Sequence, residues 1–162
     1  MSSTTKGFSV RDVTVPHGWQ SFGQVNYNIK VLPATATGNL FVVTGSIVAS
    51  LVGVVSTVGS ATSVKISLGY IGQTSGLASP LAAGVTTQAV SSVFRLPRVL
   101  GSALPAPVTA AGSSASCSQF VVSNTTLTVT TDATNSMAIT WILIWAPAAL
   151  GQPVSGITVT NS

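Results

Sequence analysis

The sequence predicts an all-β fold of about eight strands with minimal helix, of the β-sandwich or jelly-roll type. Three segments alternate apolar and polar residues with a period of two: "VNYNIKV" at 25–31, "VKISL" at 64–68 and "TLTVT" at 126–130. Such alternation is typical of half-buried strands. No stretch of a dozen residues shows a helical period, and 162 residues suffice for one domain with a real core.

The elements follow in order along the chain. Residues 1–24 are polar and rich in turn residues, and we expect a docking arm followed by a single β-sandwich domain over residues 25–162. The segment 72–92 has turn composition, Pro97 excludes 93–100 from a central strand, and 101–116 reads as a loop. Strands are predicted near 25–32, 40–49, 51–58, 63–71, 118–123, 125–131, 136–146 and 156–161.

One apolar segment raises the question of a membrane span. Residues 39–59 form a run of 21 residues without a charge, which matches the length of a spanning helix. Ten of them are Val, Ile or Thr, and Gly45, Gly53 and Gly59 interrupt the run. Because β-branched side chains fit a pleated strand better than a helix, the segment predicts two buried strands and no membrane association.

Two of the predicted strands are apolar on both faces. In "SMAITWILIWAP", Trp141 and Leu143 alternate with Ile142 and Ile144, and Ile47, Leu51 and Val55 oppose Val48, Val52 and Val58 in the other strand. A two-layer domain of this size has limited interior for such strands. We therefore expect a neighbouring subunit to cover the second face.

The chain has very few charges. Charged residues make up 5% of the sequence, there is no Glu, and 23 Ser and 21 Thr supply most of the polar surface. The net charge of +4 comes from six scattered cations, which disfavours nucleic-acid binding. The N-terminus lacks an apolar signal segment and Cys117 is the only cysteine, so we expect assembly in a cytoplasm without disulfides.

The sequence offers little material for catalysis. His17 is the only histidine, between Pro16 and Gly18, and Asp12 and Asp132 are the only acidic residues. A zinc site needs several more ligands than these, and a paired carboxylate site would use both acidic residues of the chain. No nucleotide-binding glycine motif and no G-x-S-x-G motif occur. We expect no enzyme activity, no cofactor and no metal.

Five residues are the candidate contacts for a partner. Phe8, Trp19 and Phe22 belong to the predicted arm, and aromatic residues dominate interface energetics. Arg95 and Arg98 in "FRLPR" form the closest pair of cations and suit an acidic partner surface. The structural alternative for the arm is packing on its own domain. The structural alternative for the two arginines is solvated loop ends around a buried Phe94 and Leu96.

The sequence resembles small all-β virion structural proteins of tailed bacteriophages. The resemblance rests on "LFVVTG" at 40–45, "SLVGVVST" at 50–57, "TLTVTTDATNSMAITWILIWAP" at 126–147 and the tail "GQPVSGITV". It covers about two-thirds of the chain, with a poor match over 72–117, and the first 24 residues depart from it. Such proteins include head decoration (cement) proteins, often trimeric, and they carry no catalytic residues to transfer.

The resemblance implies a non-enzymatic capsid decoration protein on the virion surface. Its partners would be further copies of itself, with a trimer favoured, and the major capsid protein that it stabilises. A phage tail or fibre component, a small-virus coat protein, and a carbohydrate- or receptor-binding β-sandwich module are the alternatives. A coat protein is disfavoured because "MSSTTKGFSVRD" holds only Lys6 and Arg11 as cations.

Overall fold

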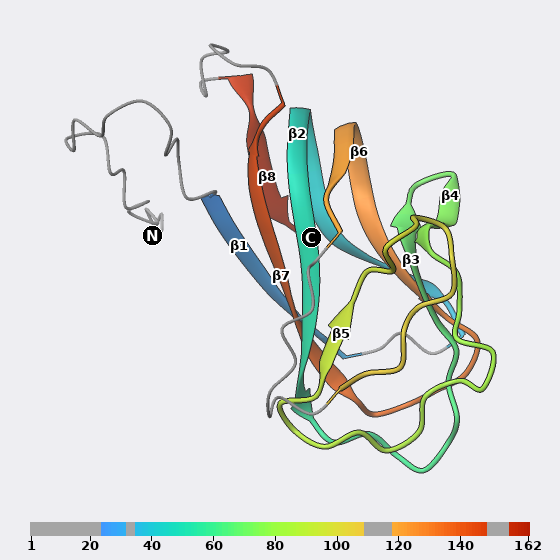
Figure 1. Cartoon of the computed structure of the whole chain (residues 1–162). Coiled ribbons are helices and arrows are strands. Elements are labelled where there is room, and N and C mark those ends of the chain that lie inside the picture. Colours follow the sequence, from blue (N-terminus) through green and yellow to red (C-terminus); the bar gives the residue numbers. More distant parts are fainter. Residues whose placement is uncertain (1–23, 32–34, 109–117, 149–155) are drawn as a thin grey trace, which may run out of the picture.

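The fold is built from eight strands (Figure 1). The computed structural model describes residues 24–31, 35–108, 118–148 and 156–162, and for residues 24–27, 30 and 31 it describes the backbone alone. The strands are β1 (Gln24–Val31), β2 (Thr37–Thr57), β3 (Ile66–Tyr70), β4 (Gln73–Ala78), β5 (Val93–Arg95), β6 (Phe120–Thr131), β7 (Ala138–Pro147) and β8 (Thr158–Asn161). These ranges contain no α-helix, which confirms the all-β prediction.

All eight strands belong to one sheet. The order along it is β1-β7-β2-β6-β3-β4, and β5 and β8 both pair with β2. Every pairing between named strands is antiparallel. The finer prediction of a two-sheet sandwich or jelly roll is not confirmed, because hydrogen bonds connect the strands continuously. The described ranges hold no helix with the length and hydropathy of a bilayer span.

The long strand β2 organises the sheet. It runs for 21 residues where the sequence predicted two strands, at 40–49 and 51–58. β6 pairs with residues 37–49 and β5 with 52–54, whereas β8 pairs with 41–44 and β7 with 47–57. Each half of β2 thus has partners on both sides. The prediction of two strands was wrong because no chain reversal occurs near Ser50, which pairs with Ile144 of β7.

A pair of irregularities lies where the two halves of β2 meet. Gly45 has a φ of +83°, Asn124 has a φ of +46°, and the register of β2 against β6 shifts between Val43 and Ser46. The side chain of Asn124 accepts a hydrogen bond from the Gly45 N–H at 2.8 Å. Such a bulge bends a strand without ending it. β6 is therefore continuous, where the sequence predicted a break at residue 124.

The sheet curls so that its first strand meets the start of β2. The Asn28 side chain in β1 donates hydrogen bonds to the carbonyl oxygen of Leu40 at 2.7 Å and to that of Ser162 at 3.1 Å. The same Leu40 carbonyl accepts the Ser162 N–H at 3.2 Å. One amide side chain therefore joins β1 to the beginning of β2 and to the end of the chain after β8.

The core fills the inside of this curl. Trp141 of β7 lies at its centre with its ring centroid 6.4 Å from that of Phe94 in β5. Gly53 lies opposite Trp141 in the register, and a Cβ there would come within 2.7 Å of the indole. The largest fully buried side chains are Trp141, Phe41, Phe94, Leu40, Ile47, Leu51, Ile66, Leu68, Leu104, Leu127, Met137 and Ile139. Burial of each large aliphatic side chain stabilises the fold by roughly 1.5–3 kcal/mol.

Two local predictions have opposite outcomes. The sequence placed 72–92 outside strands, but β4 occupies its beginning, because Gly72 with a φ of +88° allows a tight turn in which Tyr70 pairs with Gln73. By contrast, β5 is only three residues long and ends two residues before Pro97, as the proline predicted. Residues 1–23 of the predicted arm lie outside the described residues.

Candidate functional site

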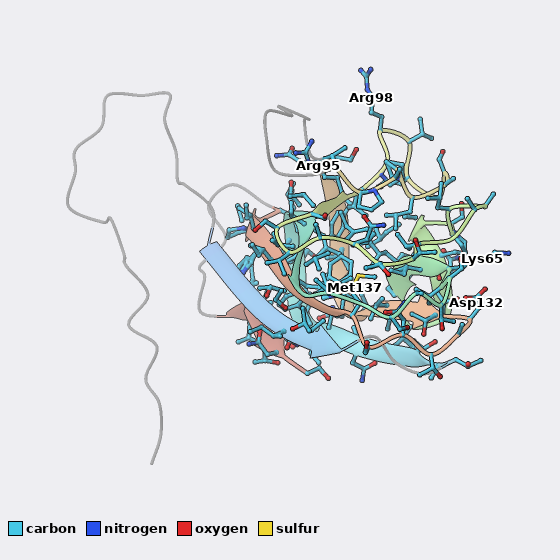
Figure 2. All side chains as sticks on the ribbon, turned by 90° about the horizontal axis from the view of Figure 1, so that it is seen from below. Lys65, Arg95, Arg98, Asp132 and Met137 are labelled. Carbon is cyan, nitrogen blue, oxygen red and sulfur yellow. The ribbon has the colours of Figure 1, made fainter. Side chains whose placement is uncertain are left out.

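The charged side chains that the structure describes lie in two separate places. Figure 2 shows Lys65 and Asp132 at one corner of the molecule and Arg95 and Arg98 on another side. The Asp132 carboxylate accepts a hydrogen bond from the backbone N–H of Lys65 at 2.7 Å. Asp132 follows β6 directly, in the segment that connects β6 to β7. The hydrogen bond from the Lys65 backbone to Asp132 is a structural contact.

The other residues considered for catalysis or metal binding are His17, Asp12 and Cys117, and all three lie outside the described residues. Within the described ranges, no three His, Cys, Asp or Glu side chains come together in a way that could hold a metal ion.

Asn135 forms the most extensive polar contact in the buried interior. Its side-chain amide donates to the carbonyl oxygens of Ser60, at 3.3 Å, and Thr62, at 2.8 Å. Its side-chain oxygen accepts the Met137 N–H at 2.9 Å. Asn135 is buried and ties the loop after β2 to the residues that precede β7. All its bonds go to backbone groups of this chain, which makes it a structural anchor.

The loop that carries the predicted cation pair is firmly held. Arg95 ends β5, is half-buried and pairs in register with Val52 of β2, whereas Arg98 is exposed. Leu96 between them is buried, and the Ser118 hydroxyl donates to the Pro97 carbonyl oxygen at 2.5 Å. The burial expected for the apolar residues of this loop is confirmed. The loop presents Arg98 to solvent (Figure 2).

The other three predicted contact residues cannot be placed relative to this loop. Phe8, Trp19 and Phe22 lie outside the described residues.

A shallow depression forms beside the β2–β6 bulge. It has a volume of about 360 Å³ and is lined by residues 42–44 of β2, residues 124–126 of β6 and Ile71. The lining contains no charged or aromatic side chain, so it offers contacts with aliphatic, hydroxyl and amide groups and no acid–base chemistry. Sequence analysis missed it because two strands build it jointly. The only local signals were Gly45 and the "SNTT" segment.

The strands predicted to be apolar on both faces have one face in the core and one outside. One alternating set is buried: Met137 just before β7, and Ile139, Trp141, Leu143 and Trp145 within it. Of the opposite set, Ile142 is half-buried and Ile144 is 42% exposed. In β2, Ile47, Leu51 and Val55 are buried whereas Val48 and Val52 are half-buried. The described part of the protein therefore leaves an apolar sheet face incompletely covered.

The geometry defines a curled antiparallel β-protein with two surface features of interest: an apolar outer sheet face and an arginine-bearing loop. Comparison with protein families, with curated proteins and with solved structures finds no match to this chain.

Proposed function

We propose that this protein is a non-enzymatic virion structural protein, a decoration protein that binds and stabilises the major capsid shell of a tailed bacteriophage. The observation that carries the proposal is the apolar outer face of β2 and β7, an arrangement suited to permanent contact with other protein surfaces. The resemblance to small phage virion proteins adds the biological setting. Its motifs fall on β2, on the second half of β6 and on β7.

The proposed mechanism is a clamp across neighbouring capsid subunits, made by a homo-oligomer. Buried apolar area contributes roughly 25 cal/mol per Å² before the costs of association. The Arg95–Arg98 loop orients the protein on the shell, because its cations attract carboxylates of the shell and are repelled by positively charged surfaces. The predicted arm with Phe8, Trp19 and Phe22 is the second proposed contact.

Charge reversal on the loop tests the proposal. Purified protein is mixed with empty shells assembled from the major capsid protein encoded in the same genome, and occupancy is measured by co-sedimentation. Wild-type protein is expected to bind, and Arg95→Glu combined with Arg98→Glu is expected to weaken binding by roughly tenfold or more. Lys65→Glu reverses one charge on another side of the molecule and is expected to bind like wild type.

The outcomes separate the parts of the proposal. Unchanged occupancy of the double variant removes the arginine loop from the contact. Failure of the wild-type protein to bind shells at all overturns the decoration role, and binding to isolated tails instead moves the protein to a tail or fibre.

A further inference from the structure

The turn at residues 99–102 presents two adjacent apolar side chains to solvent. Val99 is 70% exposed and Leu100 is 40% exposed. Among the large apolar side chains that the structure shows as exposed in the described ranges, these two are the one pair of neighbours in sequence. Single exposed apolar residues need no explanation. Two on the same turn, directly after the exposed Arg98, form a small surface that combines aliphatic groups with a cation.

Backbone hydrogen bonds hold this turn in shape. The Ser102 N–H donates to the Val99 carbonyl oxygen at 3.2 Å, and Gly101 has a φ of +80° at the third position of the turn, as a type II turn requires. The Gly101 N–H donates to the carbonyl oxygen of Leu77 in β4 at 3.0 Å. Directly after β4, the Ser79 N–H donates to the Ser102 carbonyl oxygen at 2.9 Å. The shape of the turn therefore depends on its backbone and on β4, and not on burial of its apolar side chains.

Buried side chains flank the turn on both sides. Leu96 and Leu104 belong to the core, and the Leu104 N–H donates to the Ser79 carbonyl oxygen at 2.7 Å. The segment thus places two of its large aliphatic side chains inside the protein and leaves Val99 and Leu100 outside. Because an exposed apolar side chain gains nothing from burial in the fold, this outer pair is available to a partner.

The charge around the turn is positive. Arg95 and Arg98 precede it, and Figure 2 shows Asp132, the acidic residue that the structure describes, on another side of the molecule. A partner surface that carries carboxylates is therefore favoured here. A lipid bilayer is a poorer match, because attraction to anionic lipids grows with the number of cations at the surface and is typical of clusters of roughly four to eight Lys or Arg.

We propose that the turn at 99–102 inserts Val99 and Leu100 into a hollow on the capsid shell that is lined by aliphatic side chains, with Arg98 beside a carboxylate at its rim. Side chains that dominate an interface lie in well-packed pockets from which water is excluded. Because the turn is already formed, it loses less conformational entropy on binding than an unstructured loop would lose. The choice of the shell as partner rests on the proposed function. The inference adds the residues that anchor the protein there and the chemistry that the shell offers them.

Two matched double variants test this assignment. Val99→Ser with Leu100→Ser, the turn variant, removes the apolar side chains of the turn without changing a charge. Ile71→Ser with Val58→Ser, the control variant, removes side chains of similar exposure elsewhere, 63% for Ile71 and 44% for Val58. Affinity for empty shells assembled from the major capsid protein encoded in the same genome is measured by co-sedimentation over a dilution series. Thermal melting of each variant checks that the fold persists.

The turn variant is expected to bind shells at least about tenfold more weakly than wild type, and the control variant is expected to bind like wild type. Arg98→Gln is expected to weaken binding and to reduce its dependence on the NaCl concentration, because an ionic contact is lost. Arg98→Gln binding with the wild-type affinity and salt dependence removes the rim carboxylate and overturns the inference as stated.

The outcomes separate this inference from the decoration role. Unchanged affinity of the turn variant, or an equal loss in the control variant, overturns the inference and leaves the decoration role standing. Failure of the wild-type protein to bind shells overturns both. If the turn variant fails to fold, Val99→Ser alone decides.

Flotation with vesicles of phosphatidylcholine and phosphatidylglycerol tests the lipid alternative. The wild-type protein is expected to stay behind when these vesicles float. Flotation of the wild-type protein that the turn variant loses assigns the turn to a bilayer surface and overturns the shell contact.

Discussion

Removal of the Asn135 side chain is expected to destabilise the protein more than a single polar substitution normally does. Asn135→Ala leaves the buried Met137 N–H without its acceptor and the carbonyl groups of Ser60 and Thr62 without their donor. An unsatisfied buried group costs about 1–3 kcal/mol. The Ser60 contact is long, at 3.3 Å, and contributes least. The expected loss in free energy of unfolding is therefore about 3 kcal/mol.

Urea denaturation followed by tryptophan fluorescence measures this loss, because Trp141 lies in the core. At 2–4 °C per kcal/mol for a protein of this size, the melting temperature is expected to fall by roughly 6–12 °C. A loss below about 1 kcal/mol refutes the role of Asn135 as the anchor of the loop after β2.

Asn135→Asp adds a dependence on pH with a definite sign. The introduced carboxyl group would face the carbonyl oxygens of Ser60 and Thr62, so burial and these dipoles raise its pKa in the folded state above about 3.9, its ordinary value. Below pH 4 the group is neutral in both states and donates a hydrogen bond. As the pH rises toward the higher folded-state pKa, the unfolded state ionises first and stability is lost.

The variant is therefore expected to be less stable at pH 8 than at pH 4. Wild-type protein, which has two Asp and no Glu, is the control measured at the same pH values. Equal stability of the variant at both pH values, after subtraction of the wild-type change, shows that this position opens to solvent.

Two further predictions concern the core around β7. Trp141→Phe removes an indole N–H that is buried without a hydrogen-bond partner and keeps a ring beside Phe94. The expected loss in free energy of unfolding is about 1 kcal/mol, against about 3–5 kcal/mol for Trp141→Ala. Equal losses for the two variants in urea denaturation contradict this prediction. Gly53→Ala brings a Cβ to 2.7 Å from the Trp141 ring and 2.9 Å from Ile139, and is expected to cost about 1–3 kcal/mol by overpacking. A Gly53→Ala protein as stable as wild type shows that the indole moves aside.

The strand content was predictable because burial alternates along the chain as the residues do. In β7, Ile139, Trp141 and Leu143 are buried while Thr140 and Ile142 are half-buried. The period-2 pattern fixes which side chains face the core, whatever the order of the strands in the sheet. The early end of β5 was similarly predictable, because a proline cannot donate a ladder hydrogen bond. The strand β5 itself was not among those predicted.

The continuity of β2 was not predictable from local pattern. Gly45 is compatible with a turn, a bulge or a break, and its environment selects the bulge through the bond from its N–H to Asn124. These two residues are 79 positions apart in the sequence. Asn124 also lines the depression beside Val42 and Ile71, so the depression was equally hidden.

The candidate site was predictable only in part. Burial of Phe94 and Leu96 around the arginine loop followed from the sequence, and so did two apolar faces on β7. Which of the exposed apolar side chains lie next to one another depends on the register of the strands, which the sequence does not encode locally. The connection between strands was not predictable for the same reason. One long strand with partners on both sides replaces the two strands expected.

The most direct test of the account is the molar mass of the wild-type protein by light scattering at low and high salt. Copies with a net charge of +4 repel one another, and 1 M salt screens that repulsion to about 3 Å, while apolar contact between copies persists. The account predicts a multiple of 16.3 kDa at 0.1 M NaCl that is maintained or increased at 1 M. A monomer at both concentrations, or an oligomer that dissociates in high salt, contradicts it.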